Sequence, residues 1–388
     1  MRIPRRLFSA CFRSLPVAAA VLFCLTAAAV LAAAKEQAAK ALRTGKEIYL
    51  ESCAACHGAD GRGQSRSRVG FDVPLPDFAD CNFASREPDS DWIGIASNGG
   101  PSRGFSEIMP AFGKALTLEE ITLAVAHIRT FCVDKNWPGG ELNLPRPLVT
   151  EKAFPEDEAV LAMTVNEDAD SITGKFIYEQ RFGARNQWEV MVPFGWSKRL
   201  VAPPDPETKW GSSLGDIAVA VKRAFYHDLK RGSILSGSAE LIVPTGDENT
   251  GFGKGTFVFE PFLAFGQILP GDFFLQAQAG MEIPFQRERG KAENEAFLRA
   301  AVGRSMSFRP WGRTWSPMVE VLATRELTSD EKILFDVVPQ MQVTLNKRQH
   351  IMFNVGVRLP LNETSDRNLA VMAYLLWDWF DGGFFEGW

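Results

Sequence analysis

The sequence predicts a multidomain chain, in which a small all-α domain precedes an antiparallel transmembrane β-barrel of about twelve strands. Up to about residue 133 the apolar residues recur at helical spacing, whereas from about residue 158 they alternate with polar residues. The alternating stretches are long: transmembrane barrel strands have about 9–11 residues, whereas globular strands have about 5–6. With 388 residues, the chain also exceeds the usual size of a single domain.

Residues 1–34 are predicted to be a secretory signal peptide, because a basic start, an apolar stretch and an alanine-rich cleavage region follow one another. The basic residues are Arg2, Arg5, Arg6 and Arg13. A retained membrane anchor is the alternative, but the apolar stretch is short for a spanning helix. Cys24 would suit a lipoprotein, but Phe23 precedes it where a small residue is needed. We therefore expect export and loss of both Cys11 and Cys24.

The chain is acidic, with a net charge of −5 and a pI near 5.6, and no basic patch with interleaved aromatic residues stands out. These features argue against a nucleic-acid partner. After the signal no stretch approaches the roughly 18 consecutive apolar residues of a membrane-spanning helix.

A predicted helix over residues 36–52 ends at the run Cys53-Ala54-Ala55-Cys56-His57. This C-x-x-C-H spacing offers two thiols to the vinyl groups of a haem and an adjacent histidine to its iron. A redox-active cysteine pair and half of a zinc site are the alternatives. No second C-x-x-C run completes a zinc site, and this run follows a helix rather than a strand. We predict one covalently attached haem c.

The second axial ligand of the iron is predicted to be Met109, which lies in a loop over residues 104–113 and precedes Pro110. A thioether ligand raises the haem potential and favours electron transfer. The alternative is a methionine that fills a gap in the core. His127 is the competing ligand, but it lies within a predicted helix among apolar residues, which favours a packed core histidine.

Two further helices are predicted in this domain. One begins at residues 89–92 and is stopped by Gly99-Gly100-Pro101. The other begins at residues 117–120, which have the form of a capping box, and continues through an apolar run to Phe131.

Residues 36–133 resemble a class I cytochrome c over about 100 residues. The matching positions are Gly45 and Tyr49 for the contact between first and last helix, Cys53, Cys56 and His57 for the haem site, and Met109-Pro110 for the axial loop. The resemblance implies an electron carrier with one haem. His127 departs from it, because the family commonly has an aromatic residue there.

Cys81 and Cys132 remain after the signal and haem cysteines are assigned. In an exported protein two such residues most often form a disulfide, which would tie the loop near residues 76–78 to the end of the last helix. Two free buried thiols are the alternative. Residues 134–157 contain several prolines and glycines and are predicted to be an extended linker.

Residues 158–388 are predicted to form the barrel. The predicted strands are 158–166, 172–182, 187–197, 214–226, 233–245, 256–269, 272–285, 296–308, 315–327, 333–345, 349–361 and 368–380. In the strand over residues 187–197 five apolar side chains share one face, with Trp188 and Trp196 at its ends, as expected for aromatic girdles at two membrane surfaces.

The predicted connections alternate between short turns and longer loops, as in outer-membrane barrels with short periplasmic turns. An even number of strands then places both barrel ends, and the haem domain, in the periplasm. The alternatives are a soluble β-sandwich or a lipocalin-like fold. Against a sandwich, the apolar faces would need a second layer, and no interleaved helix provides one.

The runs at residues 215–222, 241–246 and 253–255 resemble the outer-membrane transporter barrels named for the meta-pathway of phenol degradation, and the resemblance covers residues 215–361. On such a barrel the charged residues of the strands would face the lumen: Lys222, Glu240, Glu260, Glu282, Arg299, Asp336 and Arg358. They would form either a packed polar interior or a selective pore.

Together these features predict a monohaem cytochrome held by a barrel in the outer membrane of a Gram-negative bacterium, which transfers electrons at the periplasmic face. Its expected partners are outer-membrane lipid and a periplasmic redox protein or further cytochromes. A six-coordinate iron has no open position, so we predict a carrier rather than an enzyme. The alternatives are a channel whose haem domain senses redox state or gates uptake, and a terminal reductase or peroxidase.

Overall fold

The computed structural model describes residues 43–167, 170–200, 208–248, 251–287, 292–308, 312–365, 367–379 and 385. The predicted signal peptide, residues 1–34, lies outside the described residues. The chain divides into two compact units, and all the elements described below belong to the second, residues 45–388. Among the described residues no helix is long and apolar enough to cross a membrane.

Short helices make up the chain between residues 45 and 142. They are α2 (Gly45–Ser52), α3 (Ala54–His57), α4 (Arg66–Val69), α5 (Cys81–Ala84), α6 (Asp89–Asn98), η1 (Gly100–Arg103), α7 (Leu118–Ile128) and η2 (Gly140–Leu142). The predicted capping box of α7 is confirmed: the Thr117 side chain accepts from the Glu120 amide, and the Glu120 side chain accepts from the Thr117 amide. The predicted stop of α6 before Gly99 is also confirmed.

Helices α2 and α7 cross at close range. A Cβ atom placed on Gly45 would lie 2.0 Å from the carbonyl oxygen of Leu123, so only glycine permits this approach. One turn later the fully buried Tyr49 packs its ring against those of His127 and Phe131, at centroid distances of 5.5 and 5.3 Å. The contact between first and last helix therefore forms with histidine in the place of the family's aromatic residue.

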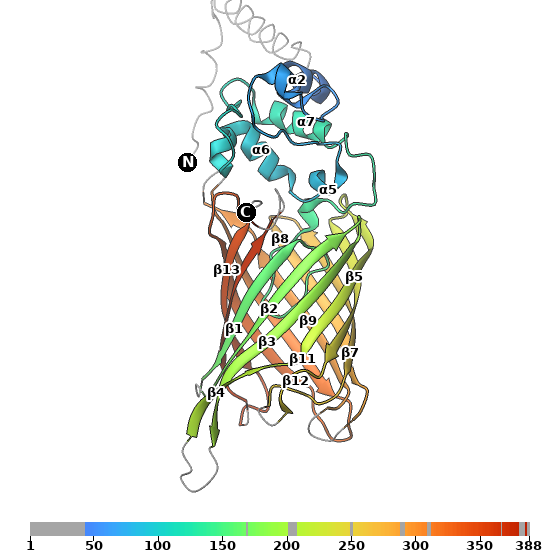
Figure 1. Cartoon of the computed structure of the whole chain (residues 1–388), viewed down its shortest axis with the longest axis vertical. Helices are drawn as coiled ribbons and strands as arrows, with labels where there is room; N and C mark the ends of the chain where they lie inside the picture. Colours follow the sequence, from blue (N-terminus) through green and yellow to red (C-terminus); the bar gives the residue numbers. More distant parts are fainter. Residues whose placement is uncertain are drawn as a thin grey trace, which may run out of the picture. The chain divides into compact units, whose positions relative to one another are not determined.

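A closed antiparallel barrel follows (Figure 1). Among the described residues its twelve strands are β1 (Glu158–Asn166), β2 (Ser171–Phe182), β3 (Asn186–Leu200), β5 (Ile217–Asp228), β6 (Ser233–Val243), β7 (Val258–Leu269), β8 (Phe273–Pro284), β9 (Glu295–Arg304), β11 (Thr314–Glu326), β12 (Leu334–Thr344), β13 (Ile351–Pro360) and β14 (Ala370–Asp378). Pairing of β14 with β1 and of β9 with β11 closes the ring. The predicted barrel of about twelve strands is confirmed.

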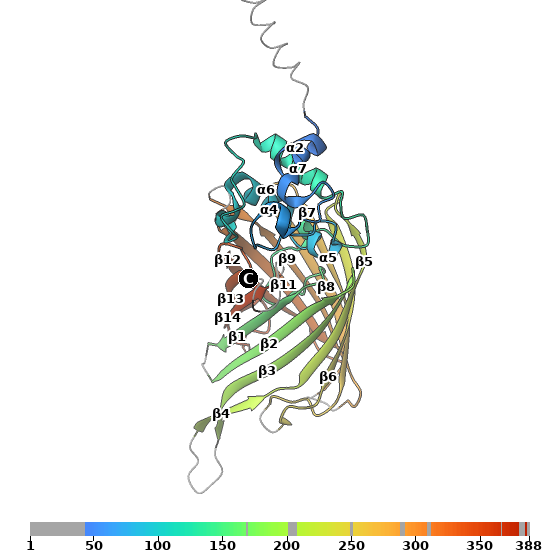
Figure 2. The same cartoon turned by 45° about the horizontal axis from the view of Figure 1, so that its top comes forward.

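One short strand, β4, was not predicted, and the strand predicted over residues 296–308 is divided into β9 and the short β10. β4 (Thr208–Leu214) pairs with the far end of β3, and β10 (Met306–Ser307) pairs with β11. The pairing of β4 lengthens one hairpin beyond the ring, where it shows below the barrel wall in Figure 2.

Each strand alternates an outward apolar face with an inward polar one. In β3, Trp188 and Val190 lie on the outer face, whereas Gln187 and Glu189, which alternate with them, are buried inside. The predicted inward residues Lys222, Glu240 and Asp336 are more than nine-tenths buried. The alternation read from the sequence is therefore the alternation of lipid-facing and lumen-facing positions.

Three short connections lie at one end of the barrel, whereas the short connection between β1 and β2, residues 167–170, lies at the other. β2 and β3 are joined by residues 183–185, β5 and β6 by 229–232, and β7 and β8 by 270–272. Glu158 pairs with both Asp378 and Glu179, so the barrel begins and ends at the end that carries these turns.

The segment predicted as a linker runs inside the barrel. Leu142, Leu144, Leu148 and Phe154 are all at least nine-tenths buried, and each packs against side chains from barrel strands. The core of the barrel is therefore made by its own N-terminal extension together with the inward faces of the strands.

Candidate functional site

The two thiols and the histidine of the C-x-x-C-H run lie on a single helical turn. Helix α2 ends at Ser52, and α3 begins one residue after Cys53. The His57 amide donates to the Cys53 carbonyl oxygen at 2.9 Å, which fixes the turn between these two residues. The sulfur atoms of Cys53 and Cys56 are not joined to each other, and both residues are half-buried.

The imidazole of His57 is half-buried and lies against aromatic rings. Its ring centroid lies 5.0 Å from that of Phe78, and Phe78 lies 5.2 Å from Trp92. Burial lowers the pKa of His57, which favours the neutral form that binds metals. Among the described residues its Nδ1 atom has no hydrogen-bond partner although it is buried. A buried polar atom of this kind is often satisfied by a group absent from the protein chain itself.

Met109 is half-buried in a loop that is pinned to the end of α6. The Gly100 amide donates to the Met109 carbonyl oxygen at 3.0 Å, and the Phe112 amide donates to the Ala96 carbonyl oxygen at 2.9 Å. A Cβ on Gly100 would lie 2.2 Å from the Ser106 carbonyl oxygen, so this glycine permits the close return of the loop. Among the described residues the backbone of Met109 contacts Gly100, at the start of η1, and Ser106.

His127, the competing ligand, packs at the crossing of α2 and α7. It is half-buried between Tyr49 and Phe131, and burial lowers its pKa. The other sulfur residues of the domain are Cys81 and Cys132, which the structure joins in a disulfide with an S–S distance of 2.08 Å.

These residues fit a covalently attached haem. Cys53 and Cys56 are the free cysteines of the part of the chain that the structure describes, and they stand one turn from a half-buried imidazole whose Nδ1 atom is buried and unsatisfied. The chemistry of this donor set, two thiols and a neutral imidazole, is that of a c-type haem site.

Side chains of the helical region also contact the turn between β12 and β13. His350 Nε2 lies 2.8 Å from a carboxylate oxygen of Glu87, and its Nδ1 lies 3.2 Å from a carboxylate oxygen of Asp378. Nearby, buried Arg103 donates to Asp91 at 2.8 Å and to the Lys347 carbonyl oxygen at 3.4 Å. The sequence analysis missed this cluster, because no local pattern links residues 263 positions apart.

Replacing His350 with phenylalanine is expected to loosen this contact by about 3 kcal/mol, because two buried carboxylates would lose their shared partner. Hydrogen exchange of residues 85–91 should rise, measured by mass spectrometry in detergent. The exposed Lys332–Glu363 ion pair gives the control, and Lys332→Gln should leave that exchange unchanged. Unchanged exchange in the His350 variant would contradict the expectation.

The same contact is expected to depend on pH. Burial raises the pKa of Glu87, but the charge and hydrogen bond of His350 outweigh burial and lower it overall. A carboxyl group with a lowered folded pKa contributes stability above its unfolded pKa and loses it as the pH falls through the lowered value. The protection of residues 85–91 should therefore decrease as the pH falls through the lowered pKa of Glu87, whereas protonation of Asp91, whose pKa burial raises to about 7, acts in the opposite direction at higher pH.

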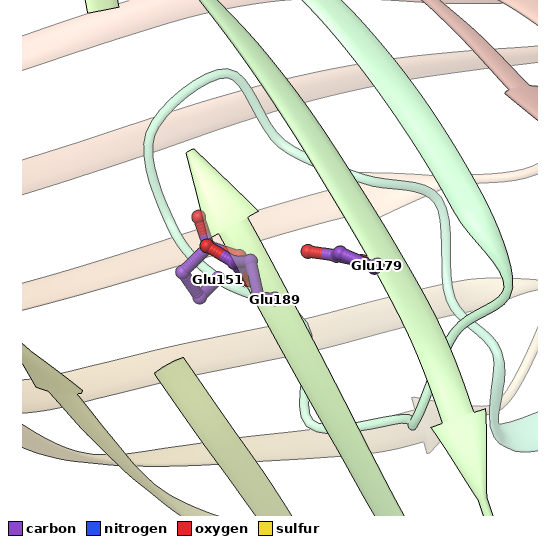
Figure 3. Close-up of side chains that lie close together, drawn as sticks. All are labelled: Glu151, Glu179 and Glu189. Atoms are coloured by element: carbon purple, nitrogen blue, oxygen red, sulfur yellow. The ribbon is translucent and has the colours of Figure 1, made fainter. Parts of the chain in front are cut away.

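Inside the barrel three carboxylates lie close together, beside the segment that was predicted as a linker. Glu179 of β2 points towards Glu151 and Glu189, and their closest oxygens lie within 4.8 Å of one another (Figure 3). Arg146 donates to Glu151 at 2.8 Å and to Glu179 at 3.0 Å. Because a guanidinium already holds two of the three, this cluster is part of an ionic network of the lumen.

Comparison with known proteins gives two family matches. Residues 40–128 match the family model described as "Cytochrome C oxidase, cbb3-type, subunit III". Residues 163–367 match the family model described as "Putative MetA-pathway of phenol degradation". A search of curated proteins found no match.

Several solved barrels are similar at low sequence identity. The NanC porin is 7% identical to this chain. The match covers 57% of this chain and 98% of the porin chain, with a TM-score of 0.40. The KdgM porin is 10% identical, with coverages of 57% and 98% and a TM-score of 0.37. An outer membrane channel from Pseudomonas putida F1 is 10% identical, with coverages of 60% and 99% and a TM-score of 0.41.

The second family model spans more than half of the 388 residues, and its match coincides with the closed barrel. The first coincides with the helices that carry the C-x-x-C-H run. The chain belongs to the family of the MetA-pathway of phenol degradation, with a cytochrome c domain ahead of its barrel.

Proposed function

We propose that this protein is a monohaem c-type cytochrome anchored in the outer membrane, and that it carries electrons at the periplasmic face. Cys53 and Cys56 would hold one haem through thioether bonds, with His57 and Met109 as axial ligands of the iron. The observation that carries the proposal is the helical turn that holds two free thiols and a half-buried imidazole within a region matching a cytochrome family.

A haem bound here supplies a one-electron couple between ferric and ferrous iron. The chain supplies the surroundings. The hydroxyl of Tyr49 donates to the Gly58 carbonyl oxygen at 2.6 Å and holds the loop that follows the motif. Phe78 and Trp92 exclude water beside His57, and the Arg129 guanidinium lies 3.7 Å from the centroid of the Trp92 ring.

The periplasmic placement of the haem domain is supported by the connections of the barrel. Short turns of outer-membrane barrels lie in the periplasm, and the barrel begins at the end that carries three of its short turns. A single haem at this face cannot move charge through an apolar band of about 25 Å. The proposal therefore requires a periplasmic redox protein or further cytochromes as partners.

The test is to produce the chain with its own signal peptide in a Gram-negative host that matures c-type cytochromes. We expect one haem-staining band in the outer-membrane fraction, with heat-modifiable migration of the same band. Haem staining in a detergent-free soluble fraction would refute anchoring, and a colourless membrane band would refute the haem.

Replacing Met109 with alanine is expected to abolish the weak absorption band of a thioether–iron bond and to lower the haem potential, because thioether ligation favours the ferrous state. Met109 is the only methionine of residues 36–133. His127→Phe is the matched control, since it removes the competing ligand and introduces the family's aromatic residue. If His127→Phe rather than Met109→Ala removes the sixth ligand, the assignment of Met109 is wrong.

A second candidate is an outer-membrane channel whose haem domain senses redox state or gates uptake. It is favoured by one observation: the segment that joins the helical domain to β1 lies within the lumen. Conductance in planar bilayers with the haem oxidised and reduced would separate the two candidates. A redox-dependent current supports gating, and a silent barrel in both states supports an anchored carrier.

A further inference from the structure

We infer that a groove on the outer wall of the barrel holds one anionic glycerophospholipid, whose phosphate is bound by Arg223. The groove, here called the lipid groove, is bounded by Arg223, Phe225, Gly237, Ala239, Leu263 and Ala279. Its volume of about 630 Å³ lies within the range of about 300–1,000 Å³ that is usual for small-molecule sites. The inference rests on the proposed placement of the barrel in the outer membrane with the β2–β3 turn in the periplasm, and it does not depend on the haem.

Small residues form the floor of the lipid groove. The strand register aligns Arg223 of β5 with Gly237 of β6, Gly237 with Leu263 of β7, and Leu263 with Ala279 of β8. Ala239 follows Gly237 on the same face of β6, because side chains two positions apart in a strand point the same way. Glycine and alanine project little beyond the backbone, so the wall is hollowed between the larger side chains of β5 and β7.

A β-bulge builds one side of the lipid groove. The register between β5 and β6 shifts between Ala224 and Tyr226, so Phe225 has no partner across the pair. Phe225 and Tyr226 are therefore both exposed, although they are consecutive residues. A Cβ placed on Gly237 would lie 2.5 Å from Phe225 Cε2 and 3.4 Å from Leu263 Cδ2. Apolar side chains of two strands thus flank the floor of the groove.

Arg223 is a cation on an apolar part of the wall. It lies between Val221 and Phe225 along β5, and both of these side chains are more than half exposed. A charged side chain on the lipid face of a barrel is destabilising, most of all far from the headgroups. The Arg223 guanidinium donates to the Asn186 side-chain oxygen at 2.8 Å, and among the described residues it forms no ion pair. Because an amide oxygen is neutral, the charge of Arg223 is not balanced within the described part of the chain.

The charged end of the lipid groove lies beside a short turn. Asn186, which pairs with Arg223, begins β3 directly after the turn over residues 183–185. The exposed Lys230 of the β5–β6 turn lies at the same end of the barrel. Turns of a membrane barrel lie at the level of the lipid headgroups, so Arg223 is within reach of a phosphate there.

These features together fit an anionic glycerophospholipid. A guanidinium binds phosphate well, and basic sites at a membrane surface select anionic headgroups. Ala239 lies two residues farther from the β5–β6 turn than Gly237, so an acyl chain on this floor would run from Arg223 towards the middle of the bilayer. A second copy of this chain would need a flat apolar face, whereas this part of the wall is hollowed and carries a charge.

The test is native mass spectrometry of the purified full-length holoprotein, which is stripped of lipid in detergent. It is then supplied with phosphatidylglycerol or with phosphatidylethanolamine of the same acyl chains. We expect one phosphatidylglycerol per chain to stay bound, with a preference of about fivefold over the zwitterionic lipid, which is the effect of about one cation near the headgroups. Arg223→Gln should abolish this preference. Arg304→Gln is the matched control, because Arg304 is an exposed arginine at the same end of the barrel, on β9, and it should keep the preference.

A second variant tests the floor of the lipid groove. Ala239→Phe places a ring where the acyl chain would lie, and it should lose both lipids. Ala300→Phe is its matched control, since Ala300 lies between the exposed Leu298 and Val302 on the outer face of β9. That control should bind lipid as wild type does. Heat-modifiable migration of every variant checks that the barrel is closed.

Four outcomes would overturn the inference. The first two are equal binding of the two lipids by wild type and an Arg223→Gln chain that keeps the preference. The third is a dimer that Ala239→Phe removes, which would place a second copy in the groove. The fourth is displacement of phosphatidylglycerol by lipopolysaccharide, which would place the groove in the outer leaflet and refute the proposed periplasmic placement as well. If the chain binds no lipid while haem staining and membrane fractionation are as expected, only the lipid groove is refuted.

Discussion

Replacing Cys53 and Cys56 together with serine is expected to give a colourless chain that still enters the outer membrane. The two thiols are the groups that would form covalent bonds to the vinyl groups, and a serine hydroxyl is far too weak a nucleophile to replace them. Neither cysteine contributes to the barrel, whose strands begin at residue 158. The loss of haem should therefore be complete while heat-modifiable migration stays at the wild-type level.

The measurement is haem staining after denaturing electrophoresis, together with a pyridine haemochrome assay of the purified chain. The matched control is Ala54→Ser with Ala55→Ser, which adds the same two hydroxyl groups to the motif and keeps both thiols. This control should stain as wild type does. Covalent haem in the double cysteine variant would show that another residue holds the haem.

Much of the barrel could be predicted from the sequence, because lipid on one side and a polar lumen on the other impose a period of two on every strand. The strand predicted over residues 158–166 was found at Glu158–Asn166, and the one predicted over 233–245 was found at Ser233–Val243. β4 was missed because its short Gly- and Ser-containing sequence has no clear alternation. It pairs with β3 because the two strands form a hairpin, and its own sequence has no strand pattern that would predict this pairing.

The segment predicted as a linker, which runs inside the barrel, shows where a local pattern stops being informative. Residues 134–157 contain prolines and glycines, which predict an extended chain but say nothing about what surrounds it. Leu144 and Leu148 have no helical or strand period that would mark them as core residues. Their burial depends on residues of distant strands, such as Gly266 and Gly356.

The candidate haem site could also be predicted only in part. Cys53, Cys56 and His57 could be predicted because five consecutive residues carry the whole pattern. The rings of Phe78 and Trp92 around His57 could not, since stacking is a tertiary contact between residues with no shared spacing. The contact of Glu87 with His350 was equally invisible, because each residue alone looks like an ordinary polar surface residue.

Gly45→Val is expected to destabilise the helical domain by about 3 kcal/mol, because atoms added at a close-packed crossing force the helices apart. A Cβ at this position would lie 2.0 Å from the Leu123 carbonyl oxygen and 2.7 Å from the carbonyl carbon. Both atoms belong to the backbone of α7, so no side-chain rotation can relieve the clash. Separating α2 from α7 would also expose Tyr49, which holds the loop after the haem motif through its bond to Gly58.

The loss of stability should lower the melting midpoint of the helices by on the order of 10–20 °C. Circular dichroism of the protein in detergent measures this midpoint. Leu50→Ala is the matched control, since Leu50 lies in the same helix and 43% of its surface is exposed. That variant should melt within a few degrees of wild type, because trimming an exposed side chain leaves no cavity. If the Gly45→Val chain has the same melting midpoint as the control, α2 and α7 do not cross at this distance. The placement of Cys53 at the end of α2 would then lose its support, since the crossing is what holds that end beside His57 and the aromatic rings.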